Sequence, residues 1–160
     1  MSYPRDGGAP WRAGLVGHGE LSLEKARQVI DETLAAAKAK SLRPLSVAVI
    51  DARGALVALA SQENATLMRW RIALGKAQAC LCMNANTRAL QQMALARPHF
   101  IAAVGEMAPL GFVPVPGGVL VRDPAGDIVG AIGVSGDTSD ADESVAMAGV
   151  EAAGLVPHQP

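Results

Sequence analysis

The chain has 160 residues and half of them are hydrophobic, so one domain of this size can bury a sufficient core without disulfides or structural metal. The formal net charge is −1, the charged residues are dispersed and only 3% of residues are aromatic, which argues against a nucleic-acid surface. Neither a spanning apolar stretch nor a signal-peptide core is present, so we expect a cytoplasmic protein without a membrane partner.

The N-terminal segment and the first helix differ sharply in pattern. Residues 1–20 contain repeated Gly and Pro without a hydrophobic period, which predicts a flexible arm that includes His18. From Ser22 to about Lys40, apolar residues recur at helical spacing, and Ser22 is placed as the N-cap.

Two segments are predicted to be β-hairpins with the same kind of turn. Residues 45–61, LSVAVIDARGALVALAS, place two β-prone runs around an Asp51–Gly54 break. Residues 112–136, FVPVPGGVLVRDPAGDIVGAIGVSG, do the same around Asp123–Gly126, where Asp opens the turn and Gly supplies a positive φ. The glycines of this second hairpin allow close approach of another backbone or of a ligand.

The remaining segments are predicted to be helical. Residues 66–107 are alanine-rich with apolar residues at helical spacing, which indicates at least one long helix followed by shorter ones, one of them opened by Pro98. A last helix follows Thr138 and Ser139 and carries acidic residues in its first turn.

Cys80 and Cys82 lie two apart in the long helical segment, where their side chains point to nearly opposite sides. They therefore make a poor chelate or disulfide, and we interpret them as small buried hydrophobic residues.

The order helix, hairpin, helices, hairpin, helix predicts one domain over residues 21–155, followed by a short tail, 156–160. Each hairpin needs cover on its apolar face, so we expect an α/β fold of the α+β kind, with a mainly antiparallel sheet and helices packed on it.

Four segments in this order resemble the GlcG/HbpS family, to which the PduO C-terminal domain also belongs. They are SVAVIDARGALVALA, the Lys76-Ala77 pair in RIALGKAQA, PVPGGVLVRDPAGDIVGAIGVSG and the acidic helix opening SDADE. The resemblance implies a profilin-like fold with a five-stranded antiparallel sheet, helices on both faces and homo-oligomeric assembly. It also implies binding of haem or a related tetrapyrrole, with some relatives tied to redox sensing, iron handling or corrinoid metabolism.

The residues that resemble the family's motifs leave two interpretations open. Lys76 lies in an apolar segment and either grips a carboxylate or haem propionate, or pairs with Asp142 or Glu143. Pro116, Gly117 and Gly118 either bind a ligand through free backbone N–H groups, or form a tight corner that admits the last helix.

Metal and haem ligation also have alternatives. Asp142 and Glu143 with Asp140 could hold iron or another hard cation, or could simply complement the helix dipole. A haem-iron ligand would be His99, the one histidine outside the chain ends, unless it is a structural or surface histidine.

The best-supported function at this point is a small-molecule binding protein for haem or a related tetrapyrrole. The alternative is a tautomerase, hydratase or lyase, or an accessory factor, acting on a small carboxylated intermediate of glycolate or aromatic catabolism. That chemistry would use Lys76, Arg69 or Arg71, Glu63 and Glu106, with Arg69 and Glu63 also expected near the ligand.

Overall fold

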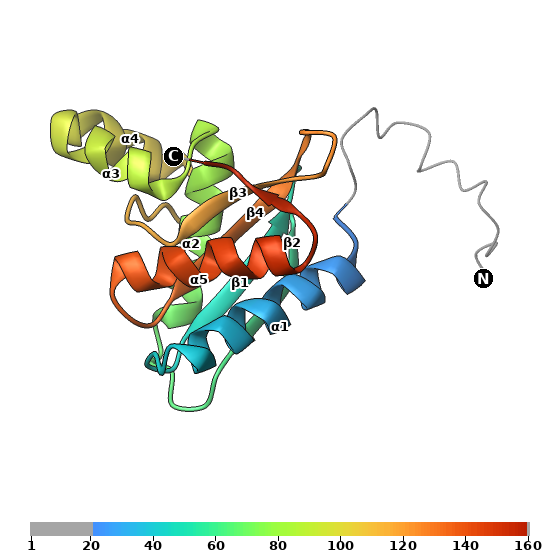
Figure 1. Ribbon diagram of the computed structural model, residues 1–160. Coiled ribbons are helices and arrows are strands. Elements are labelled where there is room, and N and C mark those ends of the chain that lie inside the picture. The colour runs from blue at the N-terminus through green and yellow to red at the C-terminus, as the bar shows by residue number, and fades with distance from the viewer. Residues whose placement is uncertain (1–20, 160) are drawn as a thin grey trace, which may run out of the picture.

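A computed structural model describes residues 21–159, and the predicted N-terminal arm with His18 lies outside the described residues. Residues 21–159 form five helices and a five-stranded sheet, in the order α1 β1 β2 α2 α3 α4 β3 β4 α5 β5. Figure 1 shows how these elements are arranged. Their bounds are α1 Leu23–Ala39, β1 Ser46–Asp51, β2 Leu56–Ser61, α2 Arg69–Met83, α3 Thr87–Ala96, α4 Pro98–Met107, β3 Gly118–Arg122, β4 Ile128–Ser135, α5 Ser139–Ala152 and β5 Val156–Pro157.

All neighbouring strands pair antiparallel, in the order β2-β1-β4-β3-β5. The two predicted hairpins therefore lie side by side through their β1 and β4 strands, with Ser46 opposite Ser135. The fifth strand comes from residues placed in the tail by the sequence, where Val156 and Pro157 pair with β3. Two residues are too short for an alternating pattern, and proline is tolerated there because β5 is an edge strand.

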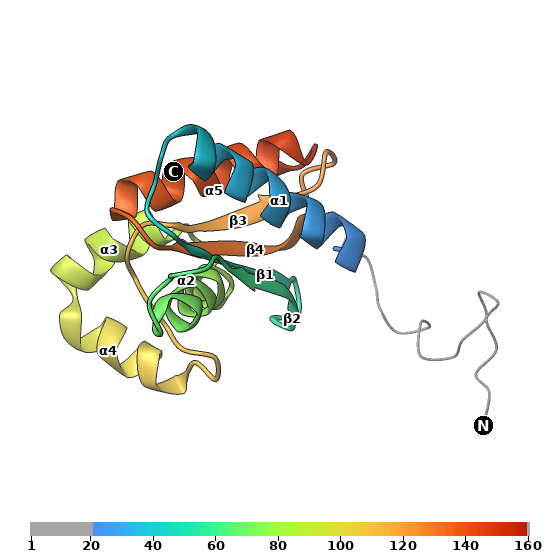
Figure 2. The ribbon, with the colours of Figure 1, turned by 90° about the horizontal axis from the view of Figure 1, so that it is seen from below.

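Helices cover both faces of the sheet, as expected. In Figure 2, α1 and α5 lie on one face and α2, with α3 and α4 beyond it, lies on the other. Successive strand residues point to opposite faces, so β1 sends Val47 and Val49 toward α1 and α5 and sends Ala48 and Ile50 toward α2.

The local signals in the sequence have the expected structural counterparts. The Ser22 hydroxyl accepts a hydrogen bond from the Lys25 amide at the start of α1, and Pro98 is the first residue of α4. Gly54 and Gly126 close the two hairpin turns with φ of 85° and 96°. No helix in residues 21–159 combines the length and apolar character that crossing a membrane requires.

Close backbone approach by glycine confirms another expectation from the second hairpin. A Cβ at Gly133 would overlap the Ala73 carbonyl of α2, and a Cβ at Gly130 would overlap the Ile50 carbonyl of β1. Helix α2 therefore packs against β4 at a distance that only glycine permits.

Candidate functional site

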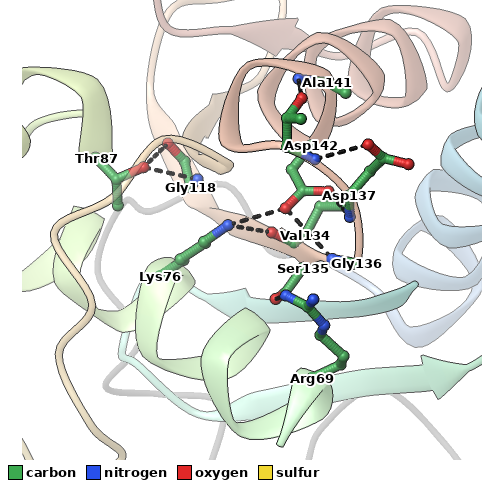
Figure 3. Close-up of polar contacts among 11 residues, drawn as sticks. Arg69, Lys76, Thr87, Gly118, Val134, Ser135, Gly136, Asp137, Ala141 and Asp142 are labelled. Atoms are coloured by element: carbon green, nitrogen blue, oxygen red, sulfur yellow. Dashed lines mark hydrogen bonds and ion pairs between the residues drawn. The ribbon is translucent and has the colours of Figure 1, made fainter. Parts of the chain in front are cut away.

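Lys76 lies almost completely buried on α2, and its side chain is 3% exposed. Its Nζ donates hydrogen bonds to the Val134 carbonyl at 2.8 Å and to Asp142 Oδ2 at 3.2 Å. Asp142 belongs to α5, on the other face of the sheet, and its side chain is 2% exposed. The ion pair with Asp142, one of the two alternatives for Lys76, is thus the arrangement that the structure shows (Figure 3).

The lysine reaches α5 just before the start of β3, beside the end of the longer strand β4. β3 begins at Gly118. Just before it, the Gly117 carbonyl accepts a hydrogen bond from the Val134 amide of β4 at 2.8 Å. Gly117 then departs from strand geometry with a φ of 121°. If β3 began earlier, its backbone would donate a hydrogen bond to the Val134 carbonyl of β4. That carbonyl accepts a hydrogen bond from Lys76 Nζ instead.

Glycine is required at position 117 for two separate reasons. Its positive φ is strained for residues with a side chain. A Cβ there would also lie 2.7 Å from both Lys76 Nζ and the Val134 carbonyl, and 3.1 Å from Asp142 Cβ. Pro116, Gly117 and Gly118 are all buried, which supports the tight-corner interpretation of this segment.

The carboxylate of Asp142 has all its strong interactions within the chain. Besides Lys76, it accepts hydrogen bonds from the Gly136 amide at 3.3 Å and the Asp137 amide at 3.0 Å. Burial lowers the pKa of Lys76 and nearby Arg69 adds to the lowering, whereas Asp142 opposes both effects. Because its ammonium is buried and engaged, Lys76 can reach an external carboxylate only by breaking this pair.

Arg69 lies next to this pair at the start of α2, where its Nη1 donates to Ser135 Oγ at 3.3 Å. On the other side, Thr87 of α3 fastens the start of β3. Its hydroxyl donates to the Gly118 carbonyl at 3.1 Å and accepts the Gly118 amide at 2.8 Å. The structure thus brings together Lys76, Asp142 and the Pro116–Gly118 segment, with Arg69 at one border.

The Glu143 carboxylate pairs with a different cation, the guanidinium of Arg88. Arg88 donates to Glu143 Oε2 at 2.7 Å and also pairs with Asp140, while Glu143 Oε1 is buried without a hydrogen-bond partner. In residues 21–159 no group of three or more His, Cys, Asp or Glu side chains is placed to hold a metal. The predicted metal site at Asp142 and Glu143 therefore gains no support from the described residues.

Two further predicted ligand residues lie apart from this cluster. Glu63 is exposed in the loop between β2 and α2, and His99 is exposed in the first turn of α4. Both stay predictions as ligand residues. Glu106, part of the alternative acid–base set, is also exposed, whereas Lys76 of the same set is buried.

An open, mainly apolar groove of about 450 Å³ lies elsewhere, between the start of α2 and the loop that follows α4. Three of its side chains are apolar yet substantially exposed, namely Met68, Trp70 and Leu110. The residues lining it are Met68, Trp70, Arg71, Ile72, Leu74, Pro109, Leu110, Gly111 and Val113. They include one cation and no carboxylate, so the groove suits an apolar ligand that carries negative charge.

The loop wall of this groove is tied to α2. The buried Gln78 accepts the Leu110 amide through Oε1 at 2.5 Å, and the Gly75 carbonyl accepts the Val113 amide at 3.2 Å. A Cβ at Gly75 would lie 2.9 Å from a Val113 methyl group, so glycine permits this close packing. The groove wall is therefore held in place by the chain itself.

Sequence reasoning missed the groove and the residues that fasten its surroundings. Gln78 carried a usable signal, since it is a polar residue in the same apolar helical segment as Lys76. Arg71 is one of the two arginines that the alternative enzyme hypothesis could use, and its guanidinium lies over the Trp70 ring, 5.1 Å from the centroid, at the groove. Nothing in the spacing of residues 68–74 and 109–113 indicated that they would meet.

The fold and the site define a class of protein: a single α+β unit with an antiparallel sheet between two helical layers that are joined by a buried ion pair. The family model described as "Haem degrading protein HbpS-like" matches residues 21–151, and the chain belongs to that family. No curated protein matches it.

Solved structures agree with this assignment. HbpS is 27% identical with a TM-score of 0.73, covering 87% of this chain and 94% of its own. The PduOC structure, a heme complex, is 21% identical with a TM-score of 0.77, covering 88% of this chain and all of its own. Klebsiella pneumoniae ORFY is 18% identical with a TM-score of 0.75, covering 88% and 95%. The resemblance predicted from the sequence is confirmed.

Proposed function

We propose that this protein binds haem or a closely related tetrapyrrole. The observation that carries the proposal is the HbpS-like family match, which covers strands β1 to β4 and both helical layers and whose description names haem as the compound degraded. The groove beside α2 offers chemistry that fits such a ligand, because its walls are apolar and Arg71 stands at it. Haem would supply an iron centre there, and the chain would supply apolar contact and a counter-charge for its carboxylates.

The buried Lys76–Asp142 pair takes no direct part in this proposal. Since the ammonium already has two acceptors in the chain, we assign it to holding α2 against α5. The alternative of an enzyme for a small carboxylated intermediate has no observation in its favour, because Glu63 and Glu106 are exposed whereas Lys76 is buried and paired with Asp142.

A hemin titration of the purified full-length chain, followed by the Soret band beside albumin, tests the proposal. We expect saturation near one equivalent per subunit or per dimer. Binding that never saturates, or that matches albumin at every concentration, would overturn it. In the same titration, a weaker Soret band for His99→Ala would support His99 as an iron ligand. An unchanged band would show that His99 does not ligate the iron.

Homo-oligomeric assembly and a cytoplasmic location belong to the same proposal. Of the ten residues of α4, only Ile101 is buried within the chain, while Phe100 and Met107 stay exposed, which leaves an apolar surface for a second copy. Light scattering on the ligand-free protein gives the subunit number. A monomer at working concentration would contradict the assembly.

A further inference from the structure

The groove formed by the first turns of α2 and the loop of residues 109–113 has properties that the buried pair lacks. It is open, its volume of about 450 Å³ is that of a small-molecule site, and its walls expose apolar side chains. Met68 is 52% exposed, Trp70 37% and Leu110 38%, so each presents apolar surface that a flat ligand could cover.

The charge of the groove narrows the class of ligand. Arg71 is the only charged residue among those that line it, and its guanidinium lies over the Trp70 ring. That contact keeps the guanidinium beside the apolar wall, where it can form a bidentate pair with a carboxylate. A ligand with a broad apolar face and carboxylates at its edge complements both features.

The wall is also preorganised, which reduces the entropy lost on binding. Gln78 and Gly75 of α2 hold the loop through hydrogen bonds to the amides of Leu110 and Val113. Gln78 is 5% exposed, so its amide group is a buried anchor for the loop. The groove thus exists before any ligand arrives.

We propose that this groove is the tetrapyrrole site, that the ligand's apolar face lies on Met68, Trp70 and Leu110, and that a carboxylate pairs with Arg71. The inference rests on the proposed function. Among the residues lining the groove, only Met68 carries an atom that can ligate haem iron, its thioether sulfur. Affinity there comes from apolar contact and the carboxylate pair, so the iron is not required.

The first experiment compares full-length variants by Kd for hemin. Met68→Glu and Leu110→Glu place a negative charge on the exposed groove wall, and each should weaken binding at least about tenfold. The matched control is Leu95→Glu, at an apolar residue that is 74% exposed on α3 and does not line the groove. It should stay within about twofold of the wild-type chain.

The second experiment separates the carboxylate from the iron. Iron-free protoporphyrin IX should bind within about threefold of hemin. Arg71→Ala should weaken binding of protoporphyrin IX but leave its dimethyl ester unaffected, and Arg71→Lys should restore part of the loss. Arg97→Ala is the matched control, because Arg97 also lies over an aromatic ring, that of Phe100, but is not part of the groove.

The failures can be told apart. If wild-type protein shows no saturable hemin binding, the proposed function fails. If the wild-type protein saturates but Met68→Glu and Leu110→Glu bind as tightly, the function stands and the groove assignment is overturned. The assignment is equally overturned if the two variants change the subunit number of the ligand-free protein, since the groove would then be a contact between copies.

Discussion

Lys76 on α2 and Asp142 on α5 form a buried ion pair at 3.2 Å that joins helices lying on opposite faces of the sheet. The pair crosses just before β3 begins at Gly118, and Gly117 leaves room for it. If β3 extended before Gly118, its backbone would fill the space through which Lys76 reaches Asp142. Lys76 and Gly117, which the sequence placed in a ligand site, and Asp142, which it placed in a metal site, therefore lie together where the two helical layers are connected.

Breaking this pair should be costly. Lys76→Met leaves the Asp142 carboxylate buried without its cation, and the free energy of unfolding should fall by about 3–5 kcal/mol. The double variant Lys76→Met, Asp142→Asn removes both charges and should lose less than the sum of the single variants. Denaturant unfolding measures all three, and strictly additive losses would contradict the coupling.

An exposed ion pair serves as the control for that series. Arg43 pairs with Asp137 at 3.4 Å, but the Arg43 side chain is 65% exposed. Arg43→Met should therefore change the free energy of unfolding by about 1 kcal/mol or less.

Gly117→Ala should destabilise the protein by at least about 3 kcal/mol, because strain at positive φ adds to overlap with Lys76 and Val134. Gly126→Ala is the matched control. Gly126 has a φ of 96°, but a Cβ there would meet nothing within 4 Å, so only the backbone strain of about 1–2 kcal/mol remains. Equal losses for the two variants would show that the space around Gly117 is unimportant.

Asp137 should give the protein a distinct acid dependence. The Arg43 amide, the Thr138 amide and the Arg43 side chain donate to its carboxylate and lower its pKa from 3.8 to about 2. Because the folded pKa is below the unfolded one, the resulting stability is present above pH 3.8 and is lost as the pH falls through about 2.

Thermal unfolding between pH 2 and pH 5 tests this expectation. Asp137→Asn should lower the Tm above about pH 4 and flatten its pH dependence below that value. Arg43→Ala should keep most of the dependence, because the Arg43 backbone amide contributes more than its side chain. A curve for Asp137→Asn parallel to that of the wild-type chain would contradict the assignment.

The two cysteines should differ in reactivity. Burial raises the pKa of Cys80 to about 12, whereas Cys82 is exposed. Since the thiolate is the reactive form, a thiol reagent at pH 8 should modify one cysteine in the folded protein and both after unfolding. Cys82→Ser should abolish the reaction of the folded chain. Rapid modification of that variant would mean that Cys80 is accessible.

The loop wall of the groove should loosen when its anchor is removed. Gln78→Leu leaves the Leu110 amide without its acceptor, which should cost about 1–3 kcal/mol and speed hydrogen exchange in residues 108–113. Gln92→Leu, at an exposed position of α3, should stay within about 0.5 kcal/mol and leave that exchange unchanged. Unchanged exchange in Gln78→Leu would show that the loop is held by other contacts.

Much of the fold could be predicted from local pattern. The Ser22 cap, the opening of α4 by Pro98 and the glycine turns at Gly54 and Gly126 all depend on residues close in sequence, and each is confirmed. The interpretation of the cysteines was half wrong: Cys80 is buried as expected, but Cys82 is exposed. Helical geometry predicts that the Cys80 and Cys82 side chains point in nearly opposite directions. Whether each is buried depends on which other elements pack against that side of α2.

The sequence by itself determined the helices, the two hairpins, the antiparallel sheet and the family, because these follow from periodicity, turn chemistry and ordered motifs. Tertiary structure alone decided that Lys76 meets Asp142, 66 positions away, and that residues 68–74 meet 109–113 in an apolar groove. Such contacts depend on how helices and strands pack against one another after they have formed. A lysine buried in an ion pair and a lysine free to bind a ligand can have the same local sequence.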